Sequence, residues 1–192
     1  MAKFTKIPIN TFEKLQLNAG VFLKSFAPDT ATVGDTDIVG ATSGGANFQA
    51  KPIFIDRGAG IDNCPQNTWE MKDLDYWDIS MTGTFVTVDT ASAKMLLAAA
   101  DVSGEKIALR NYLKAEDFTD LWWVGDYSSE NSEEAGGFIA IHMMNTLSTG
   151  GFSMQSADKE KGSFAFTFGA HISIVEPNVV PCEIYIKTGV KE

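Results

Sequence analysis

The stretch GSFAFTFGAHISI, Gly162 to Ile174, decides the fold because its large apolar residues recur at every second position. Successive side chains of a strand point to opposite faces, so this spacing places all the large residues on one face. The other face carries serine, threonine, small residues and His171. The pattern predicts a strand that covers the core of a β-sandwich or barrel. The residues expected to face that core are Phe164, Phe166, Phe168, Ala170, Ile172 and Ile174.

Two further stretches complete the predicted fold class. WDISMTGTFVTV, Trp77 to Val88, alternates in the same way and indicates a second core-facing strand. TASAKMLLAAADVSG, Thr90 to Gly104, predicts a helix that Asp89 or Thr90 caps and that Gly104 ends. We therefore predict one mainly β domain over residues 1–192, an antiparallel β-sandwich or barrel with one flanking α-helix.

The stretch GGFIAIHMMN, Gly136 to Asn145, is apolar on both faces of the strand that it predicts. A strand with one face in water should alternate apolar and polar residues. Either the helix or a neighbouring subunit covers the second face, and we favour the neighbouring subunit, because apolar surface at a free face marks an interface. The candidate subunit interface consists of Ile139, Ile141 and Met143.

Some segments do not fit a compact sandwich. Asp56 to Tyr76 is rich in turn residues and has little periodicity, which predicts a long loop that is either functional or mobile. The C-terminal run of residues 175–192 has strand-like pieces interrupted by Pro177 and Pro181, and we expect an extended arm.

Signatures of chemistry are sparse. Both histidines, His142 and His171, fall within predicted strands, and Cys64 and Cys182 lack the short paired spacing of a structural zinc site. The glycine-rich stretches match neither a phosphate-binding loop nor a dinucleotide-binding fingerprint, and there is no nucleophile elbow. We expect no enzymatic activity, no metal and no cofactor.

Composition narrows the function further. The formal net charge is −10, which argues against a protein that grips nucleic acid through a basic surface. No apolar run reaches the roughly 20 residues of a membrane-spanning helix, and no secretory signal is visible, so we expect a protein made in the cytosol. The tryptophans at positions 69, 77, 122 and 123 leave one other class open, a β-sandwich module that binds carbohydrate or mediates adhesion.

An ordered series of segments over about residues 10–175 resembles the major tail (tail tube) proteins of long-tailed bacteriophages. The segments are TFEKLQLNAGVFLKSFAPDT, IVGATSGGANFQAKPIFID, GIDNCPQNTWEMKDLDYWDISMTGTFVTV, TASAKMLLAAAD and IAIHMMNTLSTGGFSMQSADKEKGSFAFTFGAHISI. The resemblance implies packed antiparallel sheets with a flanking helix, and hexameric rings stacked into a hollow tube. It also implies a long assembly loop, here about residues 43–76, and a C-terminal arm, about residues 175–192, that tie ring to ring.

The expected function is thus that of a structural virion protein, assembled in the bacterial cytoplasm, whose tube conducts DNA during ejection. Its expected partners are further copies of itself, a tape-measure protein, and tail-tip and tail-terminator proteins, and a contractile-tail or secretion-system tube is a close relative of this interpretation. A lumen lined with carboxylates would pass DNA without binding it specifically, since phosphate is repelled. The candidate acids for the lumen or the seam between rings are Asp56, Asp62, Asp73, Asp75, Asp78, Glu130, Glu133 and Glu134.

Overall fold

The structure is a computed structural model that describes residues 6–8, 11–127 and 137–188. Within these residues the chain is mainly β, with antiparallel strands and a single α-helix, as the sequence predicts. The strands are β1 (Gln16–Leu23), β2 (Ile38–Gly40), β3 (Thr42–Asp56), β4 (Lys72–Phe85), β5 (Ala100–Ser103), β6 (Lys106–Leu109), β7 (Thr119–Tyr127), β8 (Gly137–Ser148), β9 (Ser153–Gln155), β10 (Ser163–Gly169) and β11 (Cys182–Lys187); the helix is α1 (Thr90–Leu97).

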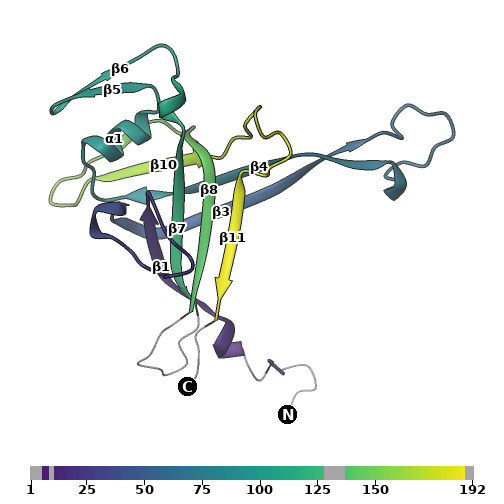
Figure 1. The fold of residues 1–192 in the computed structure, drawn as a ribbon, viewed down its shortest axis with the longest axis horizontal. Coiled ribbons are helices and arrows are strands. Elements are labelled where there is room, and N and C mark those ends of the chain that lie inside the picture. Colours follow the sequence, from purple (N-terminus) through teal and green to yellow (C-terminus); the bar gives the residue numbers. More distant parts are fainter. Residues whose placement is uncertain (1–5, 9–10, 128–136, 189–192) are drawn as a thin grey trace.

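Strand β8 joins two layers of the sheet. The strand order is β2-β1-β7-β8-β10-β4-β3, with β11 paired to β8 and β9 paired to β10. The first half of β8 pairs with β11, while Leu147 and Ser148 at its end pair with β10. In Figure 1, β7, β8 and β11 run nearly upright, and β3, β4 and β10 cross them at a steep angle. Two crossed layers connected at a corner are an orthogonal sandwich.

The core between the layers is built on the phenylalanines of β10. Phe164, Phe166 and Phe168 are buried, which confirms the prediction from their spacing. The ring of Phe22 on β1 meets Phe166 edge to face, with centroids 5.1 Å apart. The same prediction is wrong for Ile172 and Ile174, which are exposed, because β10 ends at Gly169 and the chain leaves the sheet there.

Both faces of β8 are covered by this chain itself. Ile141 and Met143 are buried in the core between the layers, and Ile139 is partly buried against it. The opposite face forms a second core, in which Phe138 and Ala140 pack with Leu23, Phe26 and Trp122. The expectation that Ile139, Ile141 and Met143 form a subunit interface is therefore corrected. Strand β8 lies between two cores of this chain, so neither of its faces requires a neighbouring subunit to cover it, and the helix is not the sole cover of either face.

The adjacent tryptophans of β7 serve these two cores separately. Trp123 faces the core between the layers, and its indole Nε1 donates a hydrogen bond to the carbonyl of Ala19 at 3.1 Å. A Cβ at Gly20 or Gly125 would come within 2.5 Å of the Trp123 ring, so these two positions require glycine. Gly20 also has φ of +71°, a conformation that other residues adopt at a cost.

The helix begins as predicted and ends earlier. Asp89 Oδ1 accepts the N–H of Ser92 at 2.7 Å, and Ser92 Oγ accepts the N–H of Asp89 at 2.8 Å, which completes a capping box. The helix ends at Leu97 because Ala98 takes φ of 58°, and the chain turns into the β5–β6 hairpin. Gly104 lies in the turn of that hairpin rather than at the end of the helix.

Candidate functional site

The most prominent feature of the surface is a long hairpin formed by β3 and β4. The two strands pair from Thr42 and Phe85 at the body to Asp56 and Lys72 at the far end. Figure 1 shows this far end projecting away from the layers, with the connecting loop at its tip. Strand β10 accompanies β4 only as far as Ser80. Beyond that residue, β3 is the only strand paired with β4 in the described part of the chain.

This hairpin takes up the two ends of the segment expected to be a loop. The sequence indicates turns from Asp56 to Tyr76, whereas the structure has strand through Asp56 and again from Lys72, so the loop spans only residues 57–71. The cross-strand ladder supplies the backbone hydrogen bonds that an irregular segment of that length would lack. The segment therefore consists of the paired end of the hairpin, Asp56 and residues 72–76, and a tip loop shorter than expected.

Apolar side chains cover the projecting part of the hairpin and are open to solvent. Phe54 lies directly opposite Leu74, and Ile53 lies directly opposite Tyr76. Neighbouring positions of β3 point to opposite faces, so each face of the hairpin carries one of these pairs. We call this surface the hairpin patch; its exposed members are 37–81% accessible and comprise Phe54, Ile55, Ile61, Trp69, Met71, Leu74 and Tyr76.

The tip loop is organised by its own polar contacts. Asp56 accepts hydrogen bonds from the N–H of Gly58 at 2.9 Å and of Asn67 at 3.3 Å. Arg57 forms an ion pair with Asp73 across the hairpin. These bonds hold the loop that presents Trp69, the most exposed tryptophan of the chain at 81%.

The five candidate acids that the structure describes all lie on the β3–β4 hairpin or its tip loop. Asp56 and Asp73 are committed to the loop and to Arg57, while Asp62 is exposed on the tip loop. Asp75 is the extra residue at the bulge of β4, and Asp78 is exposed opposite Lys51. The remaining three, Glu130, Glu133 and Glu134, lie outside the described residues.

A second exposed apolar surface lies on β11. This strand occupies residues 182–187 of the segment expected to be an arm, and it pairs along its length with β8. That part of the segment therefore lies on the sheet, because its alternating apolar residues can pair with β8. Among the described strands only β8 pairs with β11, so its other edge is open, and Ile184 and Ile186 are exposed beside that edge.

A groove connects the base of the hairpin to the segment that follows β10. It has a volume of about 400 Å³, and its apolar lining includes Tyr76, Trp77, Ile79 and Ile172. Ile174 and Val175 are exposed further along the same segment. The apolar surface of the hairpin thus continues onto the body of the protein.

The tryptophans do not build a stacking platform. Trp122 and Trp123 are buried on opposite faces of β7, and Trp77 is partly buried against the core. Trp69 alone presents an open ring face. A sugar that stacks on tryptophan would find one such residue here.

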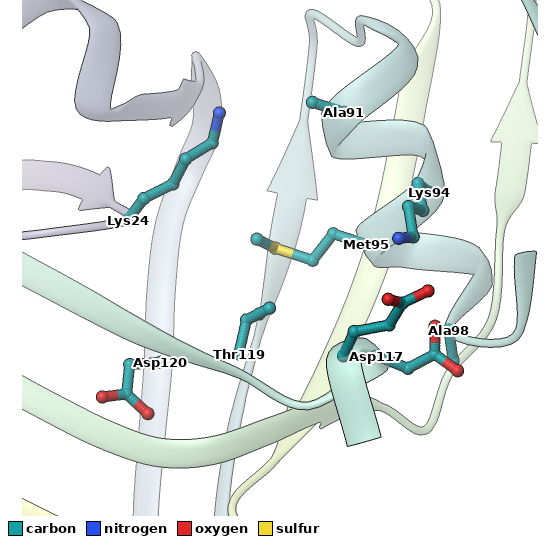
Figure 2. Close-up of a pocket in the computed structure, with 9 residues that line it drawn as sticks. Lys24, Ala91, Lys94, Met95, Ala98, Asp117, Thr119 and Asp120 are labelled. Atoms are coloured by element: carbon teal, nitrogen blue, oxygen red, sulfur yellow. The ribbon is translucent and has the colours of Figure 1, made fainter. Parts of the chain in front are cut away.

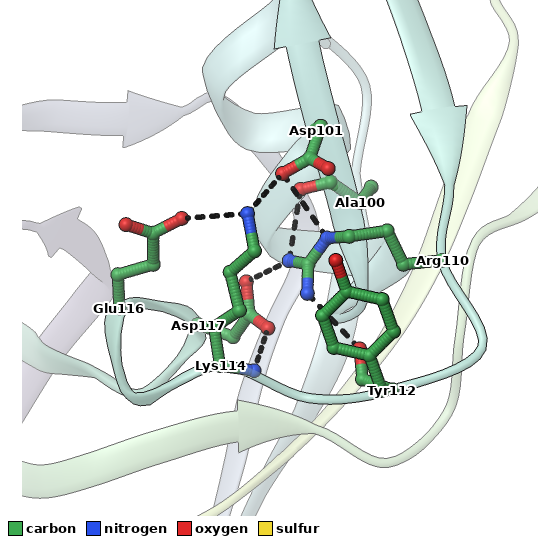
Figure 3. A network of polar contacts seen from close by, with 7 residues as sticks. All are labelled: Ala100, Asp101, Arg110, Tyr112, Lys114, Glu116 and Asp117. Atoms are coloured by element: carbon green, nitrogen blue, oxygen red, sulfur yellow. Dashed lines mark hydrogen bonds and ion pairs between the residues drawn. The ribbon is translucent and has the colours of Figure 1, made fainter.

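A network of polar contacts fixes the β5–β6 hairpin to the body (Figure 3). Arg110 Nη2 donates to Asp117 Oδ1 at 2.6 Å, and the Lys114 N–H donates to Asp117 Oδ2 at 2.8 Å. Asp101 also pairs with Arg110 and with Lys114. Burial acts to raise the pKa of Asp117, but the hydrogen bonds from Lys114 and Arg110 outweigh it and hold the pKa below its ordinary value. The main charged groups of this network bind one another, so we assign the network to the stability of the fold.

A pocket of about 380 Å³ adjoins this network, between the end of β1, α1 and the start of β7. Figure 2 shows Lys24 and Lys94 on opposite sides of Met95. Ala91 and Ala98 add to the apolar lining.

Chemistry-bearing groups are scattered over the described residues. Cys64 and Cys182 are both free thiols. No group of three or more histidine, cysteine or acidic residues is placed to hold a metal ion in the described ranges. Within the same ranges, no helix has the length and apolar character needed to cross a membrane.

The hairpin patch was missed from the sequence, although a signal for it exists. Ile53, Phe54 and Ile55 are three consecutive apolar residues in a strand, so both faces must be apolar.

In comparisons with known proteins, no protein-family model and no curated protein matches this sequence.

Proposed function

We propose that this chain is a structural protein that assembles with copies of itself into a hollow tube, the tail tube of a long-tailed bacteriophage. The observation that carries the proposal is the hairpin patch, in which a projecting hairpin exposes apolar side chains on both faces. Contiguous exposed apolar surface marks a site of association. A hairpin that leaves the body and is apolar on both sides is suited to insertion between neighbouring subunits.

The open edge of β11 supports the same proposal. An unpaired strand edge is a template for another strand, and the exposed Ile184 and Ile186 add apolar contacts beside it. The edge and the hairpin patch are different surfaces of the chain. Association between two different surfaces is heterologous and leads to rings or to open helical arrays. Stacked hexameric rings are the form that the family resemblance suggests.

The acidic character of the chain fits a conduit. With a net charge of −10, an assembled tube carries a high density of carboxylates. Carboxylates repel the phosphates of passing DNA, so DNA ejection would proceed without tight binding. The proposed partners are other copies, a tape-measure protein and the proteins at the two ends of the tail, in a virion assembled in the bacterial cytoplasm; the proposal includes no catalytic role.

Negative-stain electron microscopy of the purified protein over a concentration series tests the proposal. Rings or hollow tubes of uniform diameter are expected as the concentration rises. Particles that stay small and uniform at the highest concentration, also with tail-tip proteins added, contradict it.

One observation favours a second function, a carbohydrate-binding or adhesion module. Trp69 presents its ring at the end of a projection, where a sugar has free access. Quenching of tryptophan fluorescence by sugars, lost in Trp69→Ala while the protein stays monomeric, would support this alternative.

A further inference from the structure

Besides its backbone pairing with β8, strand β11 approaches the sheet through a charged side-chain pair, Glu183 on β11 and His142 on β8. The imidazole stacks on the indole of Trp122, its direct neighbour on β7, with ring centroids 4.0 Å apart and planes 6° apart. The side chain of His142 is largely buried. The stacking fixes the plane of the imidazole, so its two nitrogen atoms point in fixed directions.

Each nitrogen of His142 points to a carboxylate on a different strand. Nε2 lies 3.1 Å from Asp120 Oδ2 on β7, and Nδ1 lies 3.6 Å from Glu183 Oε2 on β11. Asp120 is held in place because its Oδ1 accepts the N–H of Asn145 at 3.1 Å. Glu183 is held by the hydroxyl of Tyr185, which donates to Oε2. Tyr185 in turn stacks on Trp122.

This arrangement matches the charged form of histidine. A neutral imidazole has one N–H and one lone pair, so one of the two carboxylates would face a lone pair. The imidazolium donates at both nitrogen atoms and carries the compensating charge. In the structure Nδ1 is buried and makes no hydrogen bond within the described chain, although the Glu183 carboxylate lies 3.6 Å away. The segment between β1 and β2 contributes Asp29 near Tyr185, which adds further negative charge on this side.

We propose that His142 is a proton-operated latch: when protonated it binds Asp120 on β7 and Glu183 on β11 together and so holds β11 on the sheet. The extra stabilisation requires the imidazolium, which donates at both nitrogen atoms, and it is lost when the ring gives up its proton. Release of β11 would leave the edge of β8 open from Phe138 to Met143, where β11 now pairs. The latch therefore controls which strand forms the edge of this layer.

Hydrogen exchange of the full chain at pH 5.5 and pH 8 tests the latch. The quantity compared is the protection of the β11 amides, corrected for the intrinsic effect of pH on exchange, since protection reports local opening. Losing the stabilisation of one partly exposed charge pair should make opening of β11 roughly fivefold more frequent at pH 8 than at pH 5.5. His142→Gln should abolish this difference, because glutamine does not titrate.

The matched control is His171→Gln, since the chain has two histidines and His171 contacts the carbonyl of Asn145 instead. This variant should keep the difference in protection. Glu183→Gln changes an exposed side chain, folds without the latch, and should lose the difference while His142 is intact. Equal protection of native β11 at both pH values overturns the inference, as does a difference that persists in His142→Gln or in Glu183→Gln, or that disappears in His171→Gln.

Discussion

Truncation of one exposed side chain on the hairpin should weaken assembly and leave the fold intact. Trp69 is 81% exposed, so Trp69→Ser removes few contacts within the chain. A tryptophan side chain presents about 200 Å² of surface, which at about 25 cal/mol per Å² makes the exposed part worth about 4 kcal/mol if wholly covered. A neighbouring copy that covers half of that part contributes about 2 kcal/mol to each contact. The concentration required for assembly should then rise roughly 30-fold.

Sedimentation velocity over a dilution series measures this shift, and thermal unfolding at low concentration checks the fold. The unfolding midpoint of Trp69→Ser should lie close to that of the native chain, because surface substitutions change stability by about 0.5 kcal/mol or less. Leu109→Ser is the matched control: Leu109 is 70% exposed, but it lies on β6, away from the hairpin. Assembly of Trp69→Ser at the native concentration, or an equal shift in Leu109→Ser, would refute the reasoning.

Three further predictions concern the body of the protein. Phe166→Ala should lower the free energy of unfolding by about 3–5 kcal/mol in urea, because Phe166 is buried against Phe22 and Phe85; a loss below about 1 kcal/mol would contradict the core described above. Burial, together with the charge of Glu183, raises the pKa of the Cys182 thiol to about 11, so mass spectrometry should find Cys64 alkylated well before Cys182 at pH 8, and equal rates would place β11 elsewhere. The depressed pKa of Asp117 contributes stability that is full above about pH 4 and is lost as the pH falls through the lower folded-state value; Asp117→Asn should flatten the acid limb of the stability curve, and an unchanged limb would contradict it.

The parts of the fold that the sequence predicts are those decided by local pattern. The alternation around Phe164, Phe166 and Phe168 has one solution, since only one face of that strand can meet the core. The start of α1 follows from Asp89, whose carboxylate finds its hydrogen-bond partner three residues away. Both depend on contacts within a few residues or on a simple period.

The parts that the sequence does not predict depend on contacts between distant segments. The run of alanines after Leu97 favours helix by intrinsic propensity, yet Ala100 is buried and begins β5, which pairs with β6. The second apolar face of β8 is covered by Phe26, which lies more than a hundred residues earlier in the chain. No local sequence pattern predicts that contact. The sequence does not predict the hairpin patch for a different reason. Turn residues dominate residues 56–76, so the pattern indicates a loop where strand pairing begins at Lys72.

Photo-crosslinking from the hairpin tests the central claim most directly. A photo-reactive benzophenone amino acid replaces Phe54, which lies on the exposed patch opposite Leu74. The purified protein is irradiated at concentrations where electron microscopy finds assemblies or, failing assemblies, at the highest attainable concentration, and mass spectrometry identifies the crosslinked residues. The account predicts covalent links between two copies of the chain, and it predicts fewer of them on dilution. Crosslinks confined to single chains at every concentration would contradict the claim that the hairpin is buried against another copy.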